Sequence, residues 1–395
     1  MSSIEILRSR YDVVIVGARV AGASTAMLLA RRGLRVLAVE QARYGSDTLS
    51  THALMRGGVL QLHRWGLLPL IEAAGTPCIQ STSFHYGDEE IAIPIRARNG
   101  IRGLYAPRRT VLDVILVDAA VAAGADMAHG VRLIDLMRGD DGRVVGVVVE
   151  QPGVGSIPIC ADIVIGADGL RSKVASLTGA APYRLGRNAS TFLYGYFSGL
   201  AIDGNHWYYR PGVMAGAIPT NGGEVLVCGG APEARFWDEM RLDLEAGHLQ
   251  LMREAAPELA EQLGGAKRHG PIRGFPGEPG SLRQSVGPGW ALVGDAGYFR
   301  DPATAHGITD ALRDAELLAR AIETGTERAL SDYQSQRDDF ALGLFEASDI
   351  IAGYEWDLAS VKETHLFMSD EMNREVAFLS GLDSRDRPEL ERRTA

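Results

Sequence analysis

Short apolar runs and helical patterns alternate along the first part of the chain. An apolar run at Val13–Val16 precedes a glycine-containing turn and a helix-like stretch that stops at Gly33, and a second run at Val36–Val39 ends in Glu40. Apolar runs of this length, bounded by turn residues, are typical of buried strands. The chain therefore opens with a predicted strand-helix-strand unit.

Two later stretches carry apolar residues at helical spacing, whereas the middle of the chain does not. The stripes lie within residues 108–127 and from Ile308 to Ile322, and their spacing predicts helices with one buried face. Between residues 183 and 272, short aromatic and β-branched runs are broken by Gly, Pro and Asn, which predicts an antiparallel sheet. We expect an α/β protein with α+β character in its middle part.

The turn after the first strand has the chemistry of a dinucleotide site. Gly17 and Gly22 flank the start of the helix, and Glu40 ends the second strand. Backbone N–H groups of such a turn bind a pyrophosphate together with the helix N-terminus, and the acidic residue binds ribose hydroxyls. Arg19 stands where the usual pattern has its middle glycine, so two of the three glycines are present.

Composition and charge exclude several classes of protein. The 395 residues are 46% hydrophobic and 23% charged, and the formal net charge of −10 argues against a nucleic-acid surface. The N-terminus has no apolar signal core, and no apolar run reaches the roughly 18 residues that cross a bilayer. Cys78, Cys160 and Cys228 show no metal spacing, so we expect no metal site and a reducing, cytoplasmic compartment.

Two later motifs follow the glycine turn in a set order. Residues 166–174 read GADGLRSKV and residues 294–307 read GDAGYFRDPATAHG, each after a short apolar run. With Arg109 and Asp113 at a predicted helix start, the chain from about residue 11 to residue 322 resembles the FAD-dependent monooxygenase superfamily. These are the para-hydroxybenzoate hydroxylase-like flavoproteins, to which geranylgeranyl reductases and flavin-dependent halogenases are related.

The resemblance implies a Rossmann-like FAD-binding domain with an inserted substrate-binding domain. The expected FAD-binding domain comprises residues 8–75, 104–182 and 286–325. The expected middle domain, which holds the antiparallel sheet, comprises residues 76–103 and 183–285. Residues 326–395 would form a C-terminal helical region with a loose polar tail from Asp383.

FAD is the cofactor that the resemblance implies, with NAD(P)H as the electron donor. Asp295 would bind the ribitol chain, and the turn after Pro302 would bring a helix N-terminus toward the flavin N1 and C2 carbonyl, where the reduced flavin carries negative charge. Ala305 replaces a glycine of the family's Pro-x-x-Gly-x-Gly loop, which bears on the mobility of the flavin ring. The implied cofactor-binding residues are Gly17, Val20, Ala21, Gly22, Glu40, Arg43, Arg109, Val131, Asp168, Asp295, Pro302, Gly307 and Ile308.

The implied activity is hydroxylation or epoxidation of an aromatic or polyketide-like small molecule, as in secondary metabolism. NAD(P)H reduces the flavin, O₂ gives a C4a-hydroperoxide, and the protein supplies mainly orientation and a dry pocket. Candidate catalytic residues are His52, Tyr298, Arg300 and His306. Two of these residues have structural alternatives to a catalytic role. His52 could cap a loop, and Arg300 could form a local ion pair with Asp301.

Other interpretations stay open at this point. The aromatic residues Tyr194, Tyr196, Phe197, Trp207, Tyr208 and Tyr209 either line a substrate pocket or form sheet core. The halogenase motif Trp-x-Trp-x-Ile-Pro is absent, so halogenation is not expected. Alternative functions are a geranylgeranyl reductase-like reduction of an alkene and a flavin-binding redox partner without turnover, and a separate flavin reductase is a possible partner.

Overall fold

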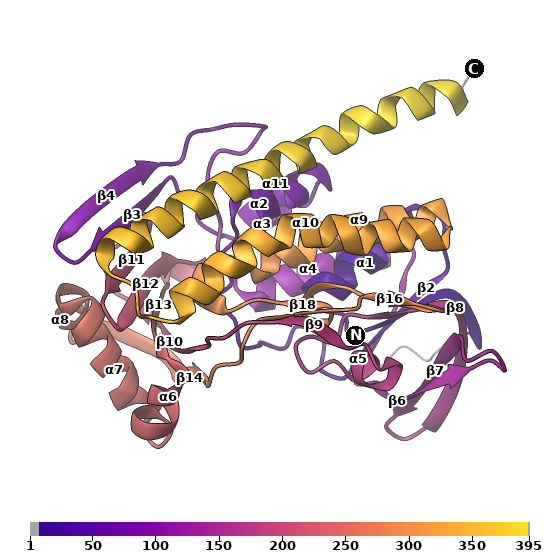
Figure 1. Ribbon diagram of the computed structural model, residues 1–395, viewed down its shortest axis with the longest axis horizontal. Coiled ribbons are helices and arrows are strands. Elements are labelled where there is room, and N and C mark those ends of the chain that lie inside the picture. Colours follow the sequence, from indigo (N-terminus) through magenta and orange to yellow (C-terminus); the bar gives the residue numbers. More distant parts are fainter. Residues whose placement is uncertain (1–7, 394–395) are drawn as a thin grey trace.

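The computed structural model describes residues 8–393, and of residues 383–393 it describes the backbone alone. The described chain forms three sheets, helices that pack on them, and a set of long C-terminal helices (Figure 1). The expected mixed α/β architecture is confirmed. Among the described residues, no helix is long and apolar enough to cross a membrane.

The first sheet contains the predicted strand-helix-strand unit. β1 (Arg10–Val16) pairs in parallel with β2 (Val36–Glu40) on one side and with β8 (Gly155–Gly166) on the other. The chain passes from β1 to β2 and reaches β8 much later, so a crevice opens at the carboxyl ends of these strands, where α/β sheets bind ligands. The other strands of this sheet are β5 (Asp126–His129), β6 (Arg132–Arg138), β7 (Val144–Gln151), β16 (Val286–Gly287) and β17 (Trp290–Leu292).

Helix α1 (Val20–Arg31) is buried along most of its length. It packs between α4 (Arg109–Ala122) and α9 (Gly307–Thr324) and against the strands below it. A helix enclosed in this way needs small or apolar residues on nearly every side, and its Ala, Met and Leu residues meet that need. Shorter helices of the same region are α2 (Arg56–Arg64), α3 (Leu68–Ala73) and α5 (Lys173–Thr178).

The second sheet has seven strands in the order β14-β10-β13-β12-β11-β3-β4. The prediction of an antiparallel sheet is correct except at one pair, because β11 runs parallel to β3. Helices α7 (Leu244–Ala255) and α8 (Pro257–Leu263) lie at the end of the molecule opposite β6 and β7 (Figure 1). The strands are β3 (Ser81–Tyr86), β4 (Glu89–Pro94), β10 (Ser190–Ser198), β11 (Asn205–Arg210), β12 (Val213–Pro219), β13 (Val225–Pro232) and β14 (Lys267–Phe275).

Most of the aromatic cluster is sheet core. Tyr196, Trp207 and Tyr209 are buried in one hydrophobic cluster with residues of the C-terminal helices, and Phe197 is buried in another with residues of α7. Tyr208 stacks on His85 at a ring distance of 4.3 Å. A small third sheet joins β9 (Pro182–Leu185), β15 (Ser281–Arg283) and β18 (Tyr298–Phe299).

Two long helices, α10 (Glu327–Ala352) and α11 (Leu358–Arg393), pack side by side across one face of the molecule (Figure 1). The sequence predicts a loose tail from Asp383, but the backbone there continues α11. The helix also packs on α2, where Leu379 is fully buried in the core that α1, α4 and α9 share. The C-terminal helix therefore packs on the part of the fold that contains α1, α2, α4 and α9.

We expect Leu379→Ala to lower the free energy of unfolding by about 2–5 kcal/mol, because it leaves a cavity in this core. Leu366→Ala is the matched control: Leu366 is on the same helix but 68% exposed, and its truncation should change stability by less than about 0.5 kcal/mol. Urea unfolding of both variants measures the difference. Equal stabilities would show that α11 does not pack on the core in solution.

Candidate functional site

A cavity of about 670 Å³ opens at the carboxyl ends of β1 and β2 and extends to the second sheet. Its walls come from the turn between β1 and α1, the loop of residues 48–53, the start of α4, the loop of residues 167–173, and the ends of β10 and β14. The segment before α9 closes the remaining side. This is the place at which an open α/β sheet is expected to bind a ligand.

The turn between β1 and α1 requires its two glycines. Gly17 has φ +96°, and a Cβ there would lie 2.3 Å from the carbonyl oxygen of Ala167. A Cβ at Gly22 would lie 1.8 Å from the carbonyl oxygen of Gly17. Any side chain at either position would force the turn away from the neighbouring loop, because such approaches are well inside van der Waals contact.

The N-terminus of α1 faces the cavity without a side-chain cap. Free N–H groups at a helix N-terminus attract an anion. Glu40 accepts hydrogen bonds from the backbone N–H groups of Ala18 (2.9 Å) and Ala42 (2.8 Å), which holds its carboxylate beside the turn. A dinucleotide with its pyrophosphate on α1 and its ribose beside Glu40 fits these groups.

Arg19 does not block the phosphate position. Its guanidinium donates to Asp113 Oδ2 (2.9 Å), and Arg109 donates to both oxygens of the same carboxylate (2.7 and 3.0 Å). Two cations therefore share one anion beside the helix N-terminus, which leaves positive charge for a pyrophosphate. The missing middle glycine is compatible with FAD binding because the Arg19 side chain is held against Asp113.

The opposite end of the cavity has a second uncapped helix N-terminus, that of α9, which begins at Gly307. Ala305 has φ +50°, the left-handed conformation for which the family pattern has glycine. The backbone of the loop thus keeps a glycine-like shape despite the substitution. We find Pro302, Gly307 and Ile308 in the cavity wall, which is the arrangement needed for the carbonyl edge of a flavin.

Asp295 lies deep in the molecule, and its side chain is exposed to the open cavity. Burial, followed by the charge of the nearby Asp310 carboxylate, raises the pKa of Asp295 to about 6. Water in the open cavity stabilises the charged form, so the shift develops fully only when a ligand displaces that water. A carboxyl of this kind suits hydrogen bonding to the hydroxyls of a ribitol chain.

A buried network of charges lies directly behind the α9 N-terminus. His306 Nε2 is 3.1 Å from Glu375 Oε2, and Arg313 donates to Glu375 Oε1 at 3.0 Å and to Asp310 at 2.8 Å. Burial alone would raise the pKa of Glu375, but the hydrogen bond and charge of His306 and the charge of Arg313 outweigh it and lower the pKa to about 2. Glu375 belongs to α11, so this helix contacts the cavity wall from behind, through His306.

Arg300 belongs to the same network, and the proposed local ion pair with Asp301 is wrong. Arg300 Nη2 donates to Asp310 Oδ2 at 2.5 Å. Asp301 instead accepts from the backbone N–H groups of Ser190 (2.6 Å) and Ala303 (2.9 Å). Asp301 therefore joins the cavity loop to the second sheet, while Arg300 faces the cavity.

His52 is buried, and its backbone has φ +45°. Its Nε2 lies 3.1 Å from the hydroxyl of Tyr196. The guanidinium of Arg108 stacks over the ring of Tyr196, with its carbon 3.5 Å from the ring centre. Burial, followed by the charges of Arg108 and Arg109, lowers the pKa of His52 to about 3. A neutral imidazole in the cavity wall keeps one N–H group and one acceptor nitrogen, so it can orient a ligand by hydrogen bonding without carrying a positive charge.

The cavity brings together most of the predicted site residues. Among the predicted residues, those lining it are Gly17, Val20, Ala21, Glu40, His52, Arg109, Val131, Asp168, Asp295, Arg300, Pro302, His306, Gly307 and Ile308. Gly22 lies beneath the turn. Arg43 is exposed and outside the lining, and Tyr298 packs behind the wall, on Phe345.

Asp168 lines the cavity, but its carboxylate is committed to its own loop. It accepts from Ser172 Oγ (2.5 Å) and from the backbone N–H groups of Lys173 and Val174. Its expected part in handling the nicotinamide nucleotide stays a prediction. Sequence reasoning missed Glu375, for which no motif gives a signal, and the pairing of Arg19 with Asp113.

A FAD binding domain family model matches residues 10–193, which hold the turn, Glu40 and the loop of residues 167–173. The chain contains a FAD-binding domain. It is a FAD-dependent oxidoreductase, and the resemblance inferred from its motifs is confirmed.

Curated relatives of this flavoprotein include reductases and an epoxidase. Menaquinone reductase of Mycolicibacterium smegmatis is 27% identical over 83% of this chain and 80% of that protein. Digeranylgeranylglycerophospholipid reductase 1 of Methanococcoides burtonii is 24% identical over 92% of this chain and 86% of that protein. Squalene epoxidase erg1 of Schizosaccharomyces pombe is 24% identical over 82% of this chain and 71% of that protein.

Solved structures share the fold of this flavoprotein. The flavin-dependent brominase Bmp2 superposes with a TM-score of 0.79 at 19% identity, over 98% of this chain and all of that chain (100%). PqsL of Pseudomonas aeruginosa, described as a probable FAD-dependent monooxygenase, superposes with a TM-score of 0.77 at 20% identity, over 90% of this chain and 99% of that chain. The Rossmann-like fold class is confirmed.

We expect Gly17→Ala to reduce the FAD content of the purified protein at least tenfold, because the new Cβ would push the turn off Ala167. Gly33→Ala is the matched control: Gly33 also has positive φ, but nothing lies within 4 Å of its added Cβ. That change should cost about 1 kcal/mol in stability and leave FAD bound. The ratio of flavin to protein absorbance measures both variants, and equal ratios would contradict the assignment of the turn.

Proposed function

We propose that this flavoprotein is a monooxygenase that hydroxylates or epoxidises an aromatic or polyketide-like small molecule, with the flavin reduced by NAD(P)H. The observation that supports this most directly is the aromatic wall of the cavity beside the α9 N-terminus. Phe192 and Tyr194 from β10, Phe275 from β14 and Phe299 from β18 line it together. Aromatic walls bind flat apolar substrates and exclude water.

The chain's own residues would hold FAD and orient the substrate. The turn at Gly17 and the α1 N-terminus would hold the pyrophosphate, Glu40 the adenosine ribose and Asp295 the ribitol. Bound FAD would supply the redox chemistry, which is acceptance of hydride and activation of O₂. The N-terminus of α9 would stabilise negative charge on the reduced ring.

The neutral state of His52 agrees with this function. The hydrogen bond to Tyr196 holds its imidazole in the wall, where it can orient a substrate hydroxyl or carbonyl. Oxygen insertion at a flavin needs a dry site more than a strong base. Phe192 and Phe299 are 4% and 9% exposed, so their rings are closely packed within the wall.

A second candidate function is reduction of an alkene. The supporting observation is His306, which lines the cavity and is hydrogen-bonded to the carboxylate of Glu375. A carboxylate-held imidazole can deliver the proton that must accompany hydride addition to a double bond. Two of the relatives are named as reductases, one of them acting on a digeranylgeranyl lipid.

Anaerobic reduction of the FAD-loaded protein, followed by admission of air, tests the proposal. NADH or NADPH should bleach the flavin, and ¹⁸O₂ should place one labelled oxygen in the product of a panel of phenols, naphthols and squalene. A product heavier by two hydrogens, formed without oxygen uptake, would establish the reductase instead. A flavin that neither nucleotide reduces would contradict the proposed electron donor and indicate a separate flavin reductase.

Phe275→Ala should lower kcat/KM for the substrate found in this way by about tenfold or more, because it removes an apolar contact from the wall. Anaerobic flavin reduction without substrate should keep its wild-type rate. Phe84→Ala is the matched control, since Phe84 lies on β3 of the same sheet outside the cavity lining. Equal losses in both variants would show that the aromatic wall does not contact the substrate.

A further inference from the structure

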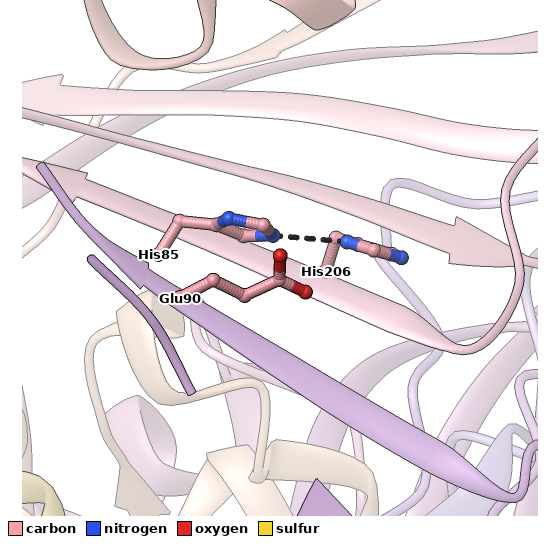
Figure 2. Close-up of side chains that lie close together, drawn as sticks. All are labelled: His85, Glu90 and His206. Carbon is pink, nitrogen blue, oxygen red and sulfur yellow. Dashed lines mark hydrogen bonds between the residues drawn. The ribbon is translucent and has the colours of Figure 1, made fainter. Parts of the chain in front are cut away.

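Three metal-ligating side chains share one face of the second sheet, away from the FAD cavity. His85 on β3 lies directly opposite Glu90 on β4, and Tyr208 on β11 lies beside His85 on the other side. Residues two apart along a strand face the same way. His206 is two residues before Tyr208 on β11, so its side chain lies on the same face of the sheet as His85 and Glu90. Figure 2 shows the Glu90 carboxylate beside the gap between the two imidazoles.

The two imidazoles are arranged as a pair of ligands. His85 Nε2 and His206 Nδ1 are 3.0 Å apart, and the ring planes differ by 17°. His206 Nε2 lies 3.0 Å from the carbonyl oxygen of Asp203. A carbonyl only accepts, so Nε2 of His206 carries the proton, and the lone pair of its Nδ1 accepts from Nε2–H of His85. Metal-binding histidines are held by this kind of second hydrogen bond to a backbone carbonyl.

Glu90 supplies an uncommitted carboxylate. The structure records no hydrogen bond or ion pair for its side chain within the described residues, and the side chain is exposed. The ligand atoms of His85, Glu90 and His206 all lie within 4.8 Å of one another. Burial lowers the pKa of His85, although the charges of Glu90 and Glu258 act in the opposite direction. Two imidazole nitrogens and one carboxylate form a ligand set that divalent transition metals use.

We propose that His85, Glu90 and His206 form a binding site for a divalent transition metal, with Zn²⁺ as the favoured ion. Two nitrogens bound to tetrahedral Zn²⁺ at about 2.0–2.1 Å are about 3.3 Å apart, so the observed pair needs to open by only about 0.3 Å. The proton on His85 Nε2 moves to its Nδ1 as the metal takes its place. Glu90 gives the third ligand and water the fourth.

The site would join three strands that come from distant parts of the sequence. The metal would cross-link β3, β4 and β11 on one face of the sheet. On the other face, Tyr86 of the same hairpin pairs with His365 Nδ1 of α11 through its hydroxyl at 2.8 Å. We therefore expect zinc to stabilise the hairpin on which the start of α11 rests.

The buried group of His306, Asp310 and Glu375 is the other cluster with ligand spacing among the described residues. It is already filled, because the guanidinium of Arg313 donates to Asp310 and to Glu375. A metal there would have to displace a fully buried cation, whereas the sheet site requires only a small opening of the two imidazoles and the movement of one exposed carboxylate.

Zinc titration of the tag-free, FAD-loaded protein against a chromophoric chelator tests the proposal. We expect one Zn²⁺ per chain, with affinity reduced at least tenfold in His85→Asn, His206→Asn and Glu90→Gln. The control is His63→Asn, because His63 is exposed on α2, outside the cluster. Its zinc affinity should equal that of the wild type.

Thermal unfolding gives an independent measurement. Zinc should raise the Tm of the wild type and of His63→Asn, and it should leave the Tm of His206→Asn unchanged. No zinc bound by the wild type, or equal affinities in the wild type and the three ligand variants, would overturn the proposal. The FAD content of each variant shows whether its fold is intact, so a loss of zinc cannot be mistaken for unfolding or for a failure of the flavin site.

Discussion

The close approach of two loops at the carboxyl ends of β1 and β8 is the constraint on which the site depends. Gly17 donates to the carbonyl of Val39 at 2.8 Å, and Ala167 donates to the carbonyl of Val16 at 2.7 Å. These bonds bring the loops so close that Gly17 has no room for a side chain. The same contact sets the start of α1 and leaves its N-terminus directed at the cavity.

The parts of the site that could be predicted are those whose positions follow from short sequence motifs. Gly17, Glu40 and Pro302 sit in motifs whose spacing follows from turns and strand ends, so their placement around one cavity could be anticipated. The position of Glu375 could not be predicted, because it lies 69 residues after its partner His306, on a helix that contains no motif. Arg43 and Tyr298 were placed by resemblance, and side-chain packing directs neither into the cavity.

The fold itself was predictable in outline because buried strands and one-faced helices follow the hydrophobic pattern. Details that depend on tertiary packing could not be predicted in this way. The parallel pairing of β11 with β3 depends on a hairpin from the first hundred residues joining a sheet built mainly from residues 190–275. Tyr194 and Tyr196 face the same side of β10, so the alternation of side chains along a strand does not distinguish them. Tyr194 lines the cavity, whereas Tyr196 is held by His52 and Arg108.

A crystal structure of the protein with bound FAD tests the central claim most directly. The account predicts the pyrophosphate at the N-terminus of α1, the adenosine ribose beside Glu40, and the isoalloxazine ring between the loop at Pro302 and the rings of Tyr194 and Phe275. A flavin bound in another orientation, or with its ring away from the α9 N-terminus, would contradict both the assignment of the cavity and the proposed chemistry.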